Sequence, residues 1–169
     1  MTGEMLPEVQ QTLQTLERIR GQVGGIIHST PLAGLNWRPE LPEGADGVNS
    51  LAVLGMHTAG SEHFWIGELI GGLPHTRRRE AEFAFVAGSA DEILERLAAV
   101  AAQSHQVLSA LDAERLASSL TYDGHVHPVR WILQHVIAHY SLHVGHMQLT
   151  YQLWNQGKAN TAPPWSPNS

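Results

Sequence analysis

The sequence predicts an all-α protein folded as a four-helix bundle, and three observations support this prediction. Four long stretches carry apolar residues at steps of three and four, which is typical of helices with one buried face. Segments rich in glycine and proline separate these stretches. No stretch shows the strict apolar and polar alternation of a half-buried strand, and no repeat or linker divides the chain. We therefore predict one bundle over residues 1–157 and a loosely ordered tail over residues 158–169.

The first helix is expected from about Pro7 to Ile27. Its apolar positions recur along one stripe: Leu6, Val9, Leu13, Leu16, Ile19, Val23, Ile26 and Ile27. A long connection then runs from Thr30 to Asn49 and contains three prolines and several glycines. A loop of this length in a compact domain usually packs against the body of the protein or lines a site.

Cap residues mark the two middle helices. The second helix should begin with Asn49 or Ser50 as N-cap and end near Ile70, where two glycines and a proline follow. Ser89 and Glu92 match a capping box, in which a hydroxyl cap is followed three residues later by a carboxylate. We therefore expect the third helix to begin at this point.

The last helix should begin at Pro128 and continue to about Trp154, before Gly157. Its histidines share one face, because at about 100° per residue they fall within an arc of about 80°. They are His135, His139, His143 and His146. Most other residues of this helix are apolar, so the histidine face needs a chemical explanation.

Composition excludes several classes of function. The chain has 169 residues and a formal net charge of −6 at pH 7, which argues against binding to nucleic acid, because phosphate neutralisation needs a surplus of Lys and Arg. The one tight basic cluster, Arg77 to Arg79, is followed closely by Glu80 and Glu82, and we interpret it as a solvated loop. The chain contains no cysteine, which excludes disulfides, thiolate ligands and a cysteine nucleophile.

We expect no secretory signal peptide at the start of this sequence. Residues 1–10 include Glu4 and Glu8 and lack the basic start and apolar stretch of a signal peptide. No apolar run approaches the ~18 residues of a membrane-spanning helix. We therefore expect a soluble, cytoplasmic protein that contacts no membrane.

The histidines of the last helix are candidate metal ligands. The chain has 11 histidines against 10 Lys and Arg, and histidine is the commonest protein ligand for transition metals. Two histidines at i and i+4 lie one helical turn apart, so both rings can reach one ion. A single histidine is more often an ordinary core or surface residue. Spacing alone does not decide whether the pair His135/His139, the pair His139/His143 or a mixture of the two binds the ion.

The second helix offers another candidate ligand, His57, on a face with small and aromatic residues. His63 points about 120° away on an α-helix, and we expect it to be exposed. Glu62 is expected to be solvated, although it could orient a ligand or close a contact between helices. His125 and His127 precede the last helix and could lie over the mouth of the bundle, but no role is assigned to them.

The chain resembles the DinB/YfiT-like superfamily of metalloenzymes over nearly its whole length. The resemblance rests on the first helix, the Leu35-Asn-Trp-Arg-Pro39 segment, the His57-Thr-Ala-Gly-Ser-Glu-His-Phe-Trp65 segment and residues 129–146. The family pattern His-x-x-x-His-x-Gly-Gln on the last helix matches His139, His143 and Gly145. The final glutamine is replaced by His146, as in the actinobacterial-type branch of DinB-like proteins.

This resemblance selects among the open ligand pairs. It implies that His57, His139 and His143 bind one divalent metal ion, zinc or nickel, with His135, His146 and Glu62 as residues that could support or line the site. It also implies an up-down-down-up bundle and a homodimer. Three histidines leave a coordination position for water or substrate, as in catalytic sites.

The resemblance further implies a class of reaction. Members of the superfamily include thiol-dependent S-transferases and isomerases that use bacillithiol, mycothiol or glutathione. We therefore expect a metal-dependent thiol S-transferase that acts on a small electrophile. The alternatives are a metal-dependent hydrolase with the same ligands, and a non-catalytic, stress-linked binding bundle. The net negative charge of the chain predicts that it does not bind DNA.

Overall fold

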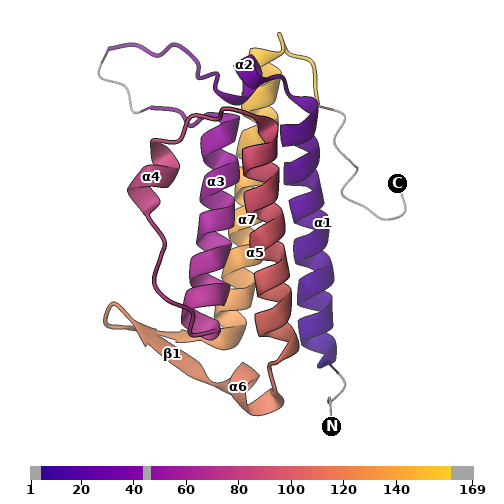
Figure 1. Cartoon of the computed structure of the whole chain (residues 1–169), viewed down its shortest axis with the longest axis vertical. Helices are drawn as coiled ribbons and strands as arrows, with labels where there is room; N and C mark the ends of the chain where they lie inside the picture. Colours follow the sequence, from indigo (N-terminus) through magenta and orange to yellow (C-terminus); the bar gives the residue numbers. More distant parts are fainter. Residues whose placement is uncertain (1–4, 44–46, 161–169) are drawn as a thin grey trace.

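Four long helices lie side by side and run the length of the molecule (Figure 1). The computed structural model describes residues 5–43 and 47–160. The four helices are α1 (Pro7–Ser29), α3 (Leu51–Glu62) with its continuation η1 (His63–Ile70), α5 (Ala90–Ser109) and α7 (Val129–Trp154). Their directions are up, down, down and up, as Figure 1 shows, so the all-α bundle predicted from the sequence is confirmed.

The predicted caps of the middle helices are present. The Ser50 side chain accepts a hydrogen bond from the backbone N–H of Val53 at 3.3 Å, which satisfies a free donor at the start of α3. The Ser89 side chain accepts from the backbone N–H of Glu92 at 3.4 Å at the start of α5. These local signals set the start of both helices.

The second long helix was predicted to be α-helical throughout, but its second half, η1, is a π-helix. The N–H of Gly71 donates to the carbonyl of Ile66 at 2.9 Å, which is the five-residue step of a π-helix. The wider turn changes the phase of the side chains. His63, at the start of η1, is buried, so the expectation that it is exposed was wrong.

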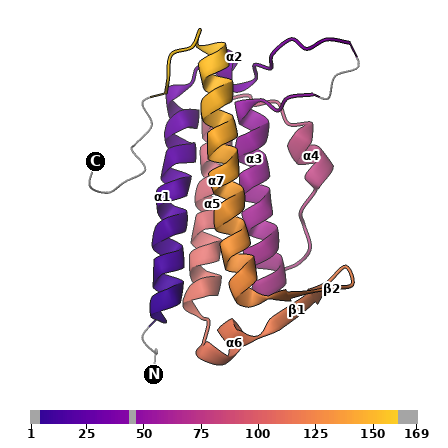
Figure 2. The same ribbon diagram turned by 180° about the vertical axis from the view of Figure 1, so that it is seen from behind.

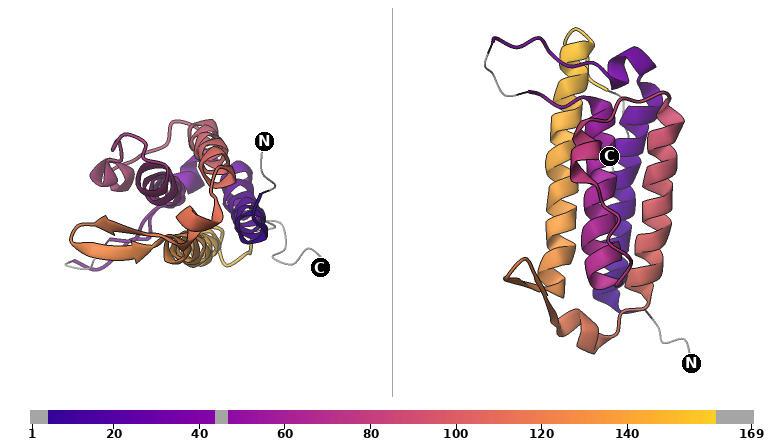
Figure 3. Two further views of the ribbon diagram at one scale, coloured as in Figure 1. Left: turned by 90° about the horizontal axis from the view of Figure 1, so that it is seen from below. Right: turned by 60° about the vertical axis from the view of Figure 1, so that its left-hand side comes forward.

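Short elements connect the long helices: α2 (Leu32–Leu35), α4 (Arg79–Phe83), α6 (Ala113–Ala117), and a hairpin of β1 (Ser119–Tyr122) and β2 (His125–Pro128). The antiparallel hairpin projects beside the lower end of the bundle (Figure 3) and was not predicted. Its turn residues Asp123 and Gly124 have positive φ angles of 50° and 75°. Asp-Gly is a strong signal for such a turn, so the sequence did contain the information.

The core lies along the axis of the bundle and draws on all four long helices. Its largest fully buried side chains include Leu16, Ile66, Leu108, Ile132 and Tyr140. Within the described residues, no helix is both long and apolar enough to cross a membrane. The predicted tail lies mostly in residues 161–169, outside the described part of the chain.

Candidate metal centre

Three histidines from two helices meet between α3 and α7. The ring centroids of His139 and His143 lie 4.4 Å apart, and each lies 5.0 Å from the ring of His57. The Nε2 atoms of His57 and His139 are 3.2 Å apart. One nitrogen from each ring lies within 4.8 Å of the others, so the three residues could hold one metal ion.

The donor set fits a divalent ion. Two nitrogens at about 2.0–2.1 Å from a tetrahedral ion lie about 3.3 Å from each other, close to the 3.2 Å between the Nε2 atoms of His57 and His139. Burial and, to a smaller extent, the charge interaction with His143 lower the pKa of His139 to about 3. Burial and, to a smaller extent, the charge interaction with His57 lower the pKa of His143 to about 4. Both rings are therefore neutral at pH 7 and have a free lone pair for a metal.

A carboxylate that the sequence reading missed holds His57 in place. Oε2 of Glu82, on α4, lies 3.0 Å from Nδ1 of His57. Arg77 donates to the same carboxylate from Nε and Nη2, at 2.8 and 2.9 Å. Burial raises the pKa of Glu82, but the hydrogen bonds from Arg77 and His57 outweigh it, and the pKa is lowered. Arg77 is thus part of this buried network, and the interpretation of Arg77 to Arg79 as a solvated loop was wrong for Arg77.

The ionised carboxylate fixes the tautomer of His57. A carboxylate can only accept, so Nδ1 of His57 must carry the proton that it donates to Glu82. Nε2 of His57 then has its lone pair free and faces His139. This carboxylate–histidine arrangement is common behind metal ligands. By contrast, Nδ1 of His139 is buried and has no hydrogen-bond partner among the described residues.

Gly60 makes room for Glu82. A Cβ atom at position 60 would lie 2.0 Å from Oε1 of Glu82, a distance that real atoms do not adopt. Gly60 lies on α3, one turn after His57, so its missing side chain lets the carboxylate of α4 approach the helix. Glycine at this position is explained by that close approach.

Aromatic residues extend from the histidine cluster toward the hairpin. His135 stacks on Trp131, with ring centroids 4.9 Å apart and an angle of 13° between the planes. Trp65 of η1 meets His135 edge-on at 4.9 Å and also contacts His127 of β2 at 5.3 Å. His135 lies 6.0 Å from His139, outside the group of three, so it can line the site. His127 therefore packs against this aromatic group at one end of the bundle.

His146 lies beside the cluster at the surface. Its ring centroid is 5.3 Å from that of His143, and it is exposed. The two Nδ1 atoms are 3.4 Å apart. His146 does not belong to the group that could hold one ion. His146 therefore contacts the candidate ligand His143 from the solvent-exposed side of the cluster.

The environment of Glu62 differs from the one expected from the sequence. It is fully buried rather than solvated. Its carboxylate accepts hydrogen bonds from Arg20 of α1 and from the hydroxyl of Tyr140, the latter at 2.8 Å. None of its hydrogen bonds within the described chain goes to the three histidines. Glu62 therefore ties α3 to α1 and α7.

His63 belongs to a second polar network, which shapes the connection after η1. Its Nε2 lies 3.2 Å from Oε1 of the buried Glu68, and its Nδ1 lies 2.6 Å from Oε1 of Gln103. Glu68 also accepts from the backbone N–H groups of Thr76 and Arg77, at 2.7 and 2.9 Å. Because it binds the backbone of residue 77, this network positions the segment that carries Arg77 toward Glu82.

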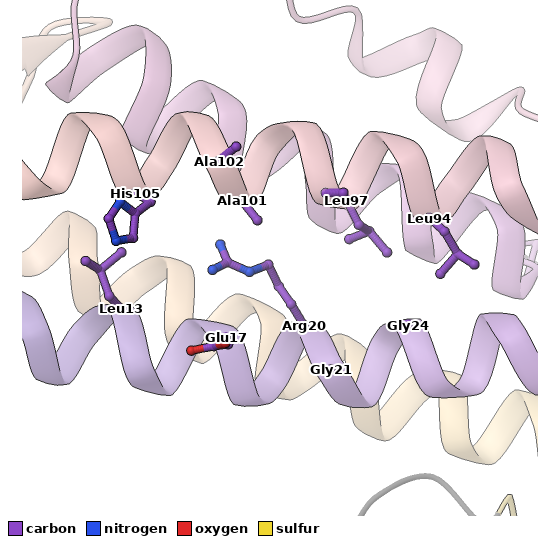
Figure 4. A pocket seen from close by; sticks show the side chains of 11 residues that line it. Leu13, Glu17, Arg20, Gly21, Gly24, Leu94, Leu97, Ala101, Ala102 and His105 are labelled. Atoms are coloured by element: carbon purple, nitrogen blue, oxygen red, sulfur yellow. The ribbon is translucent and has the colours of Figure 1, made fainter.

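A cavity of about 620 Å³ lies elsewhere in the bundle, between α1 and α5 (Figure 4). Eleven residues line it, among them Arg20 and His105, and none of the three clustered histidines does. The metal-binding geometry therefore lies at a different place from this cavity. The chemistry of the side chains, and not the volume of a cavity, identifies the candidate site.

Comparisons with known proteins agree with the fold. A family model described as the DinB superfamily matches residues 9–147. A similar solved structure is described as the crystal structure of the conserved protein of locus from Enterococcus faecalis. It is 19% identical, with a TM-score of 0.68, over 89% of this chain and 98% of that chain, and this likeness shows the fold alone. A comparison with curated proteins finds no match. Since the family model matches well over half of the chain, and the matched range includes all three clustered histidines, the chain belongs to the DinB superfamily.

Proposed function

We propose that this protein binds one divalent metal ion through His57, His139 and His143 and acts as a metal-dependent enzyme. The observation that carries the proposal is the convergence of three imidazole nitrogens within 4.8 Å. Zinc and nickel both suit three nitrogen ligands. Three protein ligands leave at least one coordination position for a substrate, as in catalytic sites.

The reaction that we propose is the transfer of a low-molecular-weight thiol to a small electrophile. A C–S bond forms while the ring C–O bond of an epoxide or the carbon–halogen bond of an alkyl halide breaks. The thiol proton ends on the released alkoxide oxygen or, when a halide ion leaves, in water. A bound divalent ion would lower the pKa of a coordinated thiol, so that the reactive thiolate exists at neutral pH. The chain itself has no cysteine, so the thiol must come from a cosubstrate. The resemblance to thiol-dependent members of the superfamily supports this class of reaction.

The surroundings of the site favour a thiol over water as the nucleophile. Metal-dependent hydrolases commonly use a free carboxylate beside the ion as general base. Here Glu82 is bound to Arg77 and His57, and Glu62 is bound to Arg20 and Tyr140. A thiolate needs no such base, because the thiol is acidic enough to ionise when it is coordinated.

Residues of this chain would orient the site and limit its hydration. Glu82 holds His57 with Nε2 toward the cluster, and Arg77 keeps Glu82 ionised. The ring of Phe83 lies 4.8 Å from that of His57 and covers this ligand from the α4 side. Trp65 and His135 provide an aromatic wall at the other end of the cluster.

Metal analysis together with a thiol panel tests the proposed function. Purified protein is assayed with an epoxide or alkyl halide, with and without each thiol, and with an activated ester without thiol. We expect thiol-dependent consumption of the electrophile that is lost on chelation and in His143→Ala. Ester hydrolysis that needs the ion and no thiol would instead support the hydrolase. Protein that holds metal and turns over neither class of substrate, across all thiols, would contradict the proposed reaction.

A further inference from the structure

Two arginines and two aromatic rings line another cavity, here called the arginine pocket. It has a volume of about 340 Å³ and lies between η1, the connection from η1 to α4, and the hairpin. This volume is in the range of pockets that bind small molecules. Figure 2 shows that α4 and the hairpin lie on the same side of α3. The residues that line the arginine pocket are Phe64, Glu68, His75, Arg77, Arg79 and Tyr122.

The arginine pocket is positively charged, although the chain as a whole has a formal net charge of −6. Glu68 is the one carboxylate among the described residues that line it, and Glu68 is buried. Its oxygens already accept from the ring of His75 and from the backbone N–H groups of Thr76 and Arg77, at 3.0, 2.7 and 2.9 Å. The charge of Glu68 is therefore bound by the protein, and the guanidinium groups remain for a ligand.

The side chains of the arginine pocket have hydrogen-bond donors that no described protein group uses. Arg77 has five N–H donors, of which Glu82 takes one from Nε and one from Nη2. Nη1 of Arg77, the guanidinium of Arg79 and the hydroxyl of Tyr122 donate to no group within residues 5–43 and 47–160. The planar fork of a guanidinium matches the two oxygens of a carboxylate.

Aromatic rings hold both guanidinium groups without neutralising them. Cζ of Arg77 lies 5.7 Å from the ring centroid of Phe64, and Cζ of Arg79 lies 4.9 Å from that of Phe83. The ring of Tyr122 meets that of Phe64 edge-on at 4.9 Å. A cation above an aromatic face is attracted to it and keeps its full charge. Both cations are therefore placed before an anion binds, which lowers the entropy cost of binding.

One side chain separates each of these arginines from the candidate metal ligand His57. Arg77 binds Glu82, which contacts Nδ1 of His57. Arg79 stacks on Phe83, whose ring contacts that of His57. Since these two distances are 4.9 and 4.8 Å, the guanidinium of Arg79 lies less than 10 Å from the ring of His57. A small organic molecule has this length, so one substrate can reach both the arginine pocket and the histidine cluster.

We propose that the arginine pocket binds a carboxylate group of the substrate that reacts at the histidine cluster. Arg77 and Arg79 bind the carboxylate, and Phe64 and Tyr122 contact the apolar part of the molecule next to it. An organic acid fits better than inorganic phosphate, because it has apolar atoms to cover these two rings. The role in the reaction rests on the proposed function, whereas the binding of the carboxylate does not.

Binding of an unreactive carboxylate tests the arginine pocket without catalysis. The full chain, loaded with zinc, is titrated in a calorimeter with 4-methylbenzoate and with 4-methylbenzamide, which has the same shape and no charge. We expect the benzoate to bind with a dissociation constant of about 1 mM or below. The amide should bind at least about 10-fold more weakly, because it forms no charge-assisted hydrogen bond with a guanidinium.

Two arginine variants locate the carboxylate. Arg79→Met keeps a side chain that packs on Phe83 and should weaken binding of the benzoate by about 10-fold or more. Arg78→Met is the matched control, because Arg78 is an exposed neighbour that does not line the arginine pocket. It removes the same charge and should change the affinity by less than about twofold. Circular dichroism checks that both variants are folded. Equal affinity for benzoate and amide, or equal losses in the two variants, would overturn the proposal.

Matched substrates test the link to the reaction and identify which substrate carries the carboxylate. One pair is 4-(chloromethyl)benzoate and 4-(chloromethyl)benzamide with the same thiol. The other pair is 3-mercaptopropanoate and 2-mercaptoethanol with the benzamide. We expect the carboxylate to raise kcat/KM at least about 10-fold in one pair, mainly through KM, and Arg79→Met but not Arg78→Met to reduce this preference.

The outcomes separate this proposal from the proposed function. Turnover of these compounds with no preference for a carboxylate in either pair would overturn the proposal and leave the proposed reaction intact. Absence of all turnover would contradict the proposed reaction instead, and the titration with 4-methylbenzoate then decides by itself whether the arginine pocket binds a carboxylate.

Discussion

Nδ1 of His57 and Oε2 of Glu82 lie 3.0 Å apart, although 25 residues separate them in the sequence. This contact joins α3 to the short helix α4 and gives a candidate metal ligand a fixed tautomer. Arg77 completes the network with two hydrogen bonds to the same carboxylate. The candidate site therefore depends on a segment outside the four long helices.

Replacing Glu82 by Gln should weaken metal binding while the fold is retained. The amide can still accept from His57, but it has no charge to raise the basicity of the ring or to pair with Arg77. Loss of a carboxylate behind a metal ligand typically costs about 10–100-fold in metal affinity. Competition with a chelator of known affinity measures the change. Glu80→Gln, an exposed change on the same helix, is the control and should leave the affinity unchanged.

Gly60→Ala should also disturb the contact between His57 and Glu82, here through a change on α3 rather than on α4. The new Cβ would lie 2.0 Å from Oε1 of Glu82, so the carboxylate must move away from its present position. Because the displaced atom is the end of a side chain, we expect a stability loss of no more than about 1–3 kcal/mol, and a clear loss of metal affinity.

A double-mutant cycle separates a loss of metal affinity caused by displacement of Glu82 from one caused by a general disturbance of the fold. Gly60→Ala should weaken metal binding little further when Glu82 is already Gln, since both changes act on one contact. Gly21→Ala, at a helical position with nothing within 4 Å, is the control. Fully additive losses in the cycle would show that Gly60 and Glu82 act separately.

The pKa values of His139 and His143 predict how the metal-free protein responds to acid. In the folded chain they are lowered to about 3 and about 4, whereas the ordinary value for histidine is 6.5. Between these values the unfolded chain binds more protons than the folded one, so stability falls as the pH falls below about 6.5. Urea unfolding of metal-free protein at pH 7 and pH 5 should show this loss. His143→Gln should make it smaller, and an unchanged slope in that variant would contradict the assignment.

The buried ion pair of Arg20 and Glu62 should matter for stability more than for metal binding. Arg20→Met leaves the fully buried carboxylate of Glu62 without its cation, which typically costs about 3–5 kcal/mol. The exposed Arg18, on the same helix, gives the matched control Arg18→Met. Denaturant unfolding measures both variants. A loss for Arg20→Met no greater than that for Arg18→Met would show that this pair contributes little.

Local signals in the sequence were enough to predict the long helices. The hydroxyl caps Ser50 and Ser89 and the spacing of apolar residues act within a few residues, so they can be read from the chain directly. The hairpin turn at Asp123 and Gly124 is also local, and it was overlooked. The π-helical turn after Glu62 was not predictable in this way, because it depends on packing against the rest of the bundle.

The candidate site was predictable only in part. The i, i+4 spacing of His139 and His143 is visible in the sequence, and resemblance to the family selected His57 as the third residue. The carboxylate of Glu62 was misjudged because its partners are far away in the chain. Glu62 meets Arg20 from 42 residues away. In the sequence alone a glutamate beside other polar residues reads as solvated, and its burial follows only from the tertiary fold.

Metal content per chain tests the central claim most directly. Protein purified without chelators and loaded with zinc or nickel is dialysed and analysed for metal, alongside His139→Ala, His143→Ala and the exposed control His28→Ala. We expect about one ion per chain in the unmodified protein and the control, as for a single site with three imidazole ligands, and none in the other two variants. Folded protein that holds no stoichiometric metal, or ligand variants that retain it, would contradict the account.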